Sequence, residues 1–302
     1  MAEADYEILD EQFRRCIRRS AQVERLYTGC RWAEGPAYFP LHRTLVWSDI
    51  PNDRMLRYDE ATGTVGAFRE PAQFVNGNAR DREGRLISCE QGGRRVTRTG
   101  HDGRTEVLAE RYEGKRFNSP NDVVVKSDGS VWFTDPTYGI DSDYEGHRAE
   151  PELDGCHVYR IDPRSGAIRQ MCDDFERPNG LAFSPNERRL YVSDTGATHR
   201  PDGPRHLRVF DVREDGTLSG GEVFATCDAG LFDGFTVDAD GRVWASSADG
   251  VRCYAPDGAL LGKVRVPETV ANVTFGGPRN NRLYICATTS LYSVLLPVNG
   301  AG

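Results

Sequence analysis

The chain has 302 residues, of which 38% are apolar, and 38 Lys and Arg against 46 Asp and Glu give a formal net charge of −8. This acidic balance argues against a nucleic-acid partner, which requires a basic face, and no apolar run is long enough to span a membrane. The apolar content allows a sizeable core, and all-β propellers and barrels of this length occur as single domains.

The first twenty residues, MAEADYEILDEQFRRCIRRS, are polar and contain no apolar segment of the kind found in secretory signals. We expect an N-terminal extension over residues 1–20, with a short amphipathic helix at 5–19, and one domain over 21–302. The eight cysteines show no C-x-x-C pair and no Cys/His metal spacing. They are therefore expected to be reduced core thiols of a cytoplasmic protein.

Six segments of the chain share one layout, in which a polar residue precedes a short apolar run, a turn and a second apolar run. The segment PNDVVVKSDGSVWFTD is typical. The marker residues, one at each strand entrance, are Glu34, Asn76, Asn121, Asn179, Asp233 and Asn272. The intervals between them run from 39 residues (233 to 272) to 58 residues (121 to 179). Such a period predicts an all-β, six-bladed β-propeller with four-stranded blades.

The two ends of this pattern suggest how the ring closes. The sixth repeat is one strand short, and residues 21–29 alternate well enough to form an N-terminal strand that completes it. The longest interval contains the stretch TYGIDSDYEGHRAEPELDG, residues 137–155, which has no strand pattern. We expect a long loop there, and such loops often cover a site.

In a propeller the first strand of each blade lines the central channel, so the markers should converge at one end of it. The set has two carboxylates and four amides, without His or Cys. Oxygen ligands suit a hard divalent cation such as Ca²⁺, whereas zinc favours His or Cys. Each marker taken alone could instead be an ordinary turn residue. Asn76 and Asn272 in particular could only line the channel.

Several segments, read in order, resemble the family of gluconolactonase, senescence-marker protein (regucalcin) and luciferin-regenerating enzyme over roughly residues 25–295. They include AEGPAYF, RFNSPNDVVVKSDGSVWFTDPTYG, RPNGLAFSPNERRLYVSDT and FDGFTVDADGRVWAS. The resemblance implies one divalent ion in the channel, Ca²⁺ with Zn²⁺, Mn²⁺ or Mg²⁺ as substitutes. It places the metal ligands at Glu34, Asn121, Asn179 and Asp233. The resemblance also suggests substrate contacts for Asn121, Arg116 and Asn118, although three extra residues separate Arg116 from Asn121. Their positions at strand ends in the repeat add Asn76, Glu90 and Asp194 as candidate substrate-binding residues.

The activity implied is that of a calcium-dependent sugar lactonase that hydrolyses D-glucono-1,5-lactone to gluconate. The ion would polarise the lactone carbonyl, and Asp233 would act as general base. A metal-bound carboxylate is a weak base, so the metal must also acidify the water or a second carboxylate must help. Glu90 and Asp194 end second strands and are candidates, and Tyr138 could pack on a sugar ring.

Other functions remain open at this point. The chain could hydrolyse another lactone or ester, as paraoxonases do. It could also be a non-catalytic Ca²⁺-binding propeller, or a condensing enzyme like strictosidine synthase, which would use a catalytic Glu and no metal. We expect a small-molecule sugar lactone as partner, no nucleic acid or membrane, and a monomer or dimer.

Overall fold

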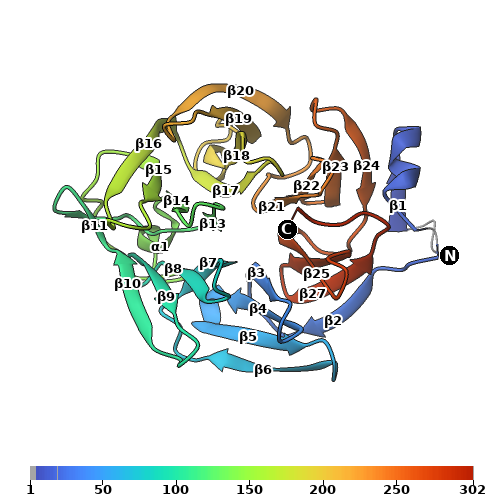
Figure 1. Cartoon of the computed structure of the whole chain (residues 1–302), viewed down its shortest axis with the longest axis horizontal. Coiled ribbons are helices and arrows are strands. Elements are labelled where there is room, and N and C mark those ends of the chain that lie inside the picture. Colours follow the sequence, from blue (N-terminus) through green and yellow to red (C-terminus); the bar gives the residue numbers. More distant parts are fainter. Residues whose placement is uncertain (1–4, 19, 302) are drawn as a thin grey trace.

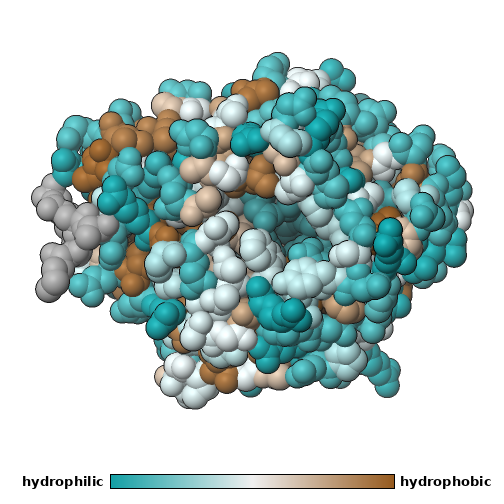
Figure 2. Space-filling view, turned by 180° about the vertical axis from the view of Figure 1, so that it is seen from behind, coloured by the Kyte–Doolittle hydropathy of each residue, from teal (hydrophilic) through white to brown (hydrophobic). Residues whose placement is uncertain are grey.

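A computed structural model describes residues 5–18 and 20–301, and its sheets form a ring around a central channel (Figure 1). The chain passes once around this ring, from blue to red in Figure 1, and places six sheets side by side in sequence order. This confirms the predicted all-β, six-bladed propeller with four-stranded blades. On the opposite face, Figure 2 shows a hollow near the middle, surrounded mostly by hydrophilic residues.

The first four blades each consist of four consecutive antiparallel strands. Blade 1 contains β3 (Ala33–Phe39), β4 (Thr44–Asp49), β5 (Arg54–Asp59) and β6 (Thr64–Arg69). Blade 2 contains β7 (Val75–Arg80), β8 (Leu86–Glu90), β9 (Arg95–Thr99) and β10 (Thr105–Ala109). Blade 3 contains β13 (Val123–Val125), β14 (Val131–Asp135), β15 (Cys156–Ile161) and β16 (Ile168–Phe175). Blade 4 contains β17 (Pro178–Phe183), β18 (Arg189–Asp194), β19 (His206–Val212) and β20 (Leu218–Thr226).

The last two blades take strands from the N-terminal part of the chain. Blade 5 contains β21 (Phe235–Val237), β22 (Val243–Ser247), β23 (Gly250–Tyr254) and β24 (Leu260–Val264), with β1 (Tyr6–Ile8) as a fifth strand. Blade 6 contains β25 (Val270–Gly276), β26 (Arg282–Ala287) and β27 (Ser290–Leu295). Its fourth strand is β2 (Glu24–Thr28), which pairs antiparallel with β27.

The N-terminal extension differs from the expected amphipathic helix over residues 5–19. The described part forms β1 followed by a short 3-10 helix at Glu11–Arg15. Tyr6 pairs with Val264 on the edge of blade 5, and Phe13 is fully buried 6.1 Å from the Trp244 ring. Pairing with an open sheet edge satisfies backbone groups that a helix would satisfy internally. The apolar residues that look helical in sequence therefore pack against blade 5.

The hydrophobic core lies between neighbouring blades rather than in one central cluster. Trp132 of blade 3, for example, packs edge-on against Phe183 of blade 4, with ring centroids 5.5 Å apart. All eight cysteines are free, and seven of them are buried. The helices are short, α1 covering only Tyr138–Asp141, and none in the described part of the chain has the length and apolar character needed to cross a bilayer.

Candidate metal and substrate site

Glycine follows the marker residue at the entrance of four blades. These pairs are Glu34-Gly35, Asn76-Gly77, Asn179-Gly180 and Asp233-Gly234. A Cβ atom on Gly180 would lie 2.4 Å from the Asp233 carbonyl oxygen, and one on Gly35 would lie 2.1 Å from that of Asn76. Any larger residue would therefore force adjacent first strands apart. Glycine allows the ring to narrow at the marker layer.

Hydrogen bonds between blades hold this narrow layer together. The Gly77 amide donates to the Asn121 carbonyl at 2.7 Å, and the Gly180 amide donates to the Asp233 carbonyl at 3.1 Å. Hydroxyl groups on the second strands add a further link, since Thr134 Oγ1 donates to the Asn179 carbonyl at 2.8 Å. Ser193 Oγ donates to the Asp233 carbonyl at the same distance. The Asp233 carbonyl is therefore held by two donors, and the carbonyls of Asn121 and Asn179 by one donor each.

Two carboxylates of different blades lie close enough in this layer to repel each other. Burial raises the pKa of Glu34 well above its usual range, and the charge of Asp233 raises it further, followed by that of Asp122. Burial likewise raises the pKa of Asp233 to about 8, with added repulsion from Glu145 and Asp122. Glu34 is only 3% exposed, whereas Asp233 is partly exposed. Carboxylates buried together without a cationic partner are costly and favour a bound cation.

Asparagine side chains hold these carboxylates in place. Asn272 Nδ2 donates to Glu34 Oε2 at 2.9 Å, and the Asn272 side-chain oxygen accepts from the Val273 amide. Asn272, predicted only to line the channel, therefore orients a metal ligand. On the opposite side, the Asn179 amide lowers the pKa of Asp233, in part offsetting burial and repulsion.

The fit of this site to a metal can be tested on Asn121. Its side-chain oxygen is buried without any hydrogen-bond partner in the structure, and the residue is 2% exposed. A buried oxygen without a donor is unusual and calls for a ligand. In the described residues, no group of three or more His, Cys, Asp or Glu is placed to bind a metal. The donors present, two carboxylates and amide oxygens, fit a hard cation such as Ca²⁺ rather than zinc.

The long loop predicted at residues 137–155 begins with α1, and residues 137–150 of it form what we call the roof loop. The roof loop is tied to blade 4, because the Tyr138 hydroxyl lies 2.7 Å from Thr195 Oγ1 and 2.9 Å from Thr198 Oγ1. These bonds give Tyr138 an anchoring role and leave the predicted sugar stacking unsupported. Glu145, on the same loop, acts on Asp233 and was missed at the level of sequence, where it looks like one more loop acid.

The side chains of Arg116 and Asn118 donate hydrogen bonds to backbone carbonyls and not to the predicted metal ligands. Arg116 lies in a small hairpin of β11 (Arg111–Tyr112) and β12 (Lys115–Arg116). Its guanidinium donates to the Gly93 carbonyl at 3.1 Å. The Asn118 amide group donates to the carbonyls of Asp135 and Gly155, while its own oxygen stays unpartnered. The substrate role of both residues stays a prediction.

Asp194 belongs to a structural motif that recurs at the end of the second strand. Its carboxylate accepts from the amides of Glu176 and Arg177 at 3.0 and 2.9 Å. Asp49 and Asp135 bind the amides before their own blades in the same way. A carboxylate that satisfies loop amides in three blades has a role without substrate. We therefore leave Asp194 out of the proposed site.

Glu90 is also fully occupied by partners of its own blade. It accepts from Arg95 Nε at 2.6 Å and from Thr97 Oγ1 at 3.1 Å, and Arg69 lies 3.7 Å away. Asn76 is buried, and its carbonyl accepts from Ser48 Oγ at 2.7 Å. The structure thus brings Glu34, Asn121, Asn179 and Asp233 to one layer, and gives the other predicted residues structural partners.

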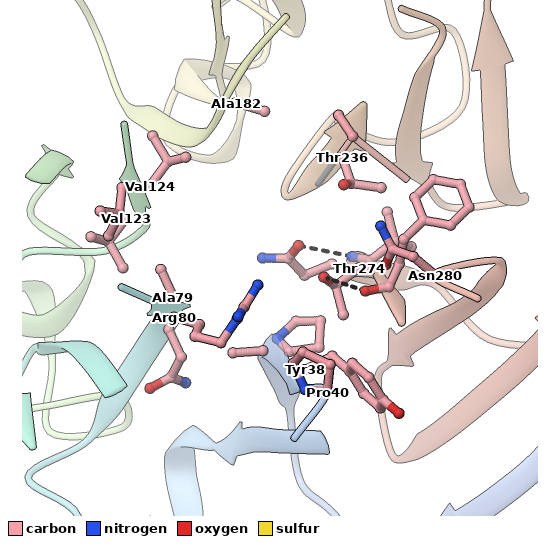
Figure 3. Close-up of a pocket in the computed structure, with 18 of the residues that line it drawn as sticks. Tyr38, Pro40, Ala79, Arg80, Val123, Val124, Ala182, Thr236, Thr274 and Asn280 are labelled. Atoms are coloured by element: carbon pink, nitrogen blue, oxygen red, sulfur yellow. Dashed lines mark hydrogen bonds between the residues drawn. The ribbon is translucent and has the colours of Figure 1, made fainter. Parts of the chain in front are cut away.

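A cavity of about 700 Å³ occupies the channel beyond this layer (Figure 3). It extends from Asp122 and Asn272 along the later residues of the first strands, past Arg80 and Thr236. None of the four predicted metal ligands lines this cavity. Asn272 lines the cavity and also donates a hydrogen bond to Glu34. Asp122 and Asn272 therefore mark the end of the cavity that lies next to the predicted metal ligands.

The chain matches the family model described as the SMP-30/Gluconolactonase/LRE-like region over residues 32–289. A gluconolactonase of Zymomonas mobilis is 30% identical over 300 residues, covering 91% of this chain and 81% of the relative. A pentonolactonase of Haloferax volcanii is 32% identical over 267 residues, covering 85% and 82%. The solved structure of a gluconolactonase from Xanthomonas campestris is 41% identical, with a TM-score of 0.91 over 97% of this chain and 95% of that one. The resemblance seen in the motifs is confirmed, and the chain belongs to the SMP-30/gluconolactonase/LRE-like family.

Proposed function

We propose that the protein is a lactone hydrolase that acts on sugar lactones, D-glucono-1,5-lactone first among them, with Ca²⁺ as its cofactor. The observation that carries the proposal is the interacting pair Glu34 and Asp233, which share one layer with the unpartnered oxygen of Asn121. The names of the relatives support the reaction, since both the gluconolactonase and the pentonolactonase open a sugar lactone.

The ion would be held by Glu34, Asn121, Asn179 and Asp233, and when bound it supplies a Lewis acid that polarises the lactone carbonyl. Oxygen donors from carboxylates and amides favour Ca²⁺, and Mn²⁺, Mg²⁺ or Zn²⁺ remain possible substitutes. Asn272 fixes the rotamer of Glu34 through its 2.9 Å bond. The blade-to-blade bonds described above hold the backbones of Asn121, Asn179 and Asp233, so little reorganisation is needed during the reaction.

Asp233 is the group that we propose to receive the proton of the attacking water. It is partly exposed, whereas Glu34 and Asn121 are buried, so a water beside the substrate reaches Asp233 most easily. Water oxygen bonds to the lactone carbonyl carbon and its proton moves to the carboxylate. The ring C–O bond then breaks, and the same proton passes to the leaving oxygen to give the open hydroxy acid.

The direct test is hydrolysis of D-glucono-1,5-lactone followed by proton release, corrected for the spontaneous rate. Protein treated with a chelator should lose activity and regain it with added Ca²⁺. Asp233→Asn should stay inactive in Ca²⁺, while Asp194→Asn, a matched aspartate with loop partners, should keep most of the wild-type kcat if it folds. Activity that survives complete metal removal would contradict the proposal.

The pentonolactonase relative favours a second substrate class, the five-carbon sugar lactones. A comparison of kcat/KM for D-glucono-1,5-lactone and a pentonolactone decides between them. The four ligands are the same in both cases, so this comparison leaves the metal assignment unchanged.

A further inference from the structure

The roof loop leaves blade 3 and touches three other blades. On blade 4, the Tyr138 hydroxyl bonds to Thr195. The Tyr144 ring lies under the Arg31 guanidinium of the segment entering blade 1, 5.3 Å from ring centroid to guanidinium carbon. The His147 ring contacts Phe74, which precedes blade 2, at 5.2 Å between centroids. A loop that reaches blades on opposite sides of the channel must cross its mouth.

The roof loop is also folded against itself. The His147 amide donates to the Gly139 carbonyl at 3.0 Å, and the Ala149 amide donates to the Ile140 carbonyl at 3.1 Å. Gly146 is buried, and a Cβ atom there would lie 2.1 Å from the Gly139 oxygen. These contacts fix the backbone on both sides of Glu145.

Glu145 lies in sequence between Tyr144 and His147, the two residues that touch blades 1 and 2, and it is half-buried where the loop crosses the channel mouth. Its charge is the largest electrostatic contribution to the raised pKa of Asp233. Burial raises the pKa of Glu145 itself to about 7, and the only other influence is Asp141. Within the part of the chain that the structure describes, Glu145 has no hydrogen-bond or ion-pair partner. A half-buried carboxylate without a donor lacks the partners that such groups ordinarily have.

We propose that Glu145 accepts hydrogen bonds from hydroxyl groups of a polyhydroxylated lactone held between the roof loop and the metal-ligand layer. The inference rests on the proposed function and specifies which part of the substrate the loop recognises. Sugar hydroxyls are donors, and a carboxylate accepts two or more of them. A lactone without hydroxyls cannot supply these donors, so the site should discriminate against it. Glu145 is thus a specificity-determining residue, separate from the metal ligands.

The test compares two six-membered lactones that share the ester and differ in hydroxyl groups, D-glucono-1,5-lactone and δ-valerolactone, in saturating Ca²⁺. Glu145→Ala should lower kcat/KM for gluconolactone by about 10- to 100-fold, the value of a hydrogen bond to a charged group, and change that for δ-valerolactone by less than about threefold. Glu150→Ala is the control, since Glu150 is exposed on the same loop, and both rates should stay within about twofold of wild type.

Equal loss on both lactones, or no loss on gluconolactone, would overturn the inference while leaving the lactonase proposal intact. A wild type inactive on every lactone would instead overturn the proposed function itself. If δ-valerolactone is hydrolysed too slowly to follow, inhibition constants give the same comparison. The constant for D-glucitol should then rise in Glu145→Ala by the factor seen with gluconolactone, and that for δ-valerolactone should stay unchanged.

Discussion

Replacing Asp233 by Asn should stabilise the metal-free protein at alkaline pH. The folded protein raises the pKa of Asp233 from 3.8 to about 8 by burial and by the nearby charges of Glu145 and Asp122. The folded state therefore binds this proton more tightly than the unfolded state, and stability falls as pH rises from about 4 to about 8. At about 1.36 kcal/mol per pKa unit, this shift lowers the free energy of unfolding at alkaline pH by at most on the order of 5 kcal/mol. The variant loses this penalty because its amide is neutral.

Thermal unfolding of chelated wild type and Asp233→Asn across this pH range measures the effect. The two proteins should unfold at similar temperatures near pH 4, and the variant should unfold roughly 5 °C higher above pH 8. Saturating Ca²⁺ should offset much of this difference, because ligand at a hundred times its Kd stabilises the wild type by about 2.7 kcal/mol. A variant that is less stable than wild type at high pH without metal would refute the reasoning.

Three further substitutions test separate parts of the site. Asn121→Ala removes an oxygen that has no hydrogen-bond partner. Calorimetry should therefore show a Ca²⁺ affinity at least about tenfold weaker, with little change in the stability of the metal-free protein. A large loss of stability would assign Asn121 a structural role. Gly180→Ala places a Cβ 2.4 Å from the Asp233 carbonyl and should cost about 2–4 kcal/mol in urea unfolding, and an unchanged midpoint would contradict the close-approach argument. Tyr138→Phe loses the bond to Thr195 and should increase hydrogen exchange of the roof loop by mass spectrometry at a cost of about 1 kcal/mol; unchanged exchange would show that the hydroxyl does not anchor it.

The repeat, the blade number and the long loop could be predicted because each depends on local signals. Alternating apolar residues, turn residues and a constant spacing of markers identify the first two strands of every blade. The Asn and Asp markers could be brought together because equivalent positions in a ring must converge. The glycine after four of the markers was the unused signal, since its function appears only when a Cβ is seen to clash with the next blade.

The acids at the ends of strands could not be assigned their roles from sequence alone. Asp194 and Asp233 both lie at a strand end, yet the Asp194 carboxylate binds loop amides whereas the Asp233 carboxylate interacts electrostatically with Glu34. The direction of a side chain depends on the backbone around it, which local sequence does not specify. Glu145 could not be singled out for a related reason. Its position near Asp233 depends on the path of the roof loop across the channel mouth, which the sequence does not specify. The helix predicted over residues 5–19 was wrong for a similar reason, because Tyr6–Ile8 pair as β1 with the open edge of blade 5.

The central claim is that one divalent ion in the marker layer and lactone hydrolysis depend on each other. The most direct measurement is the rate of D-glucono-1,5-lactone hydrolysis as free Ca²⁺ is raised over chelated protein, beside the calorimetric binding curve of the same sample. The account predicts one binding site, a rate that follows its occupancy with the same midpoint, and loss of both curves in Asp233→Asn. A rate that is independent of Ca²⁺, or binding that persists unchanged in the variant, would contradict it.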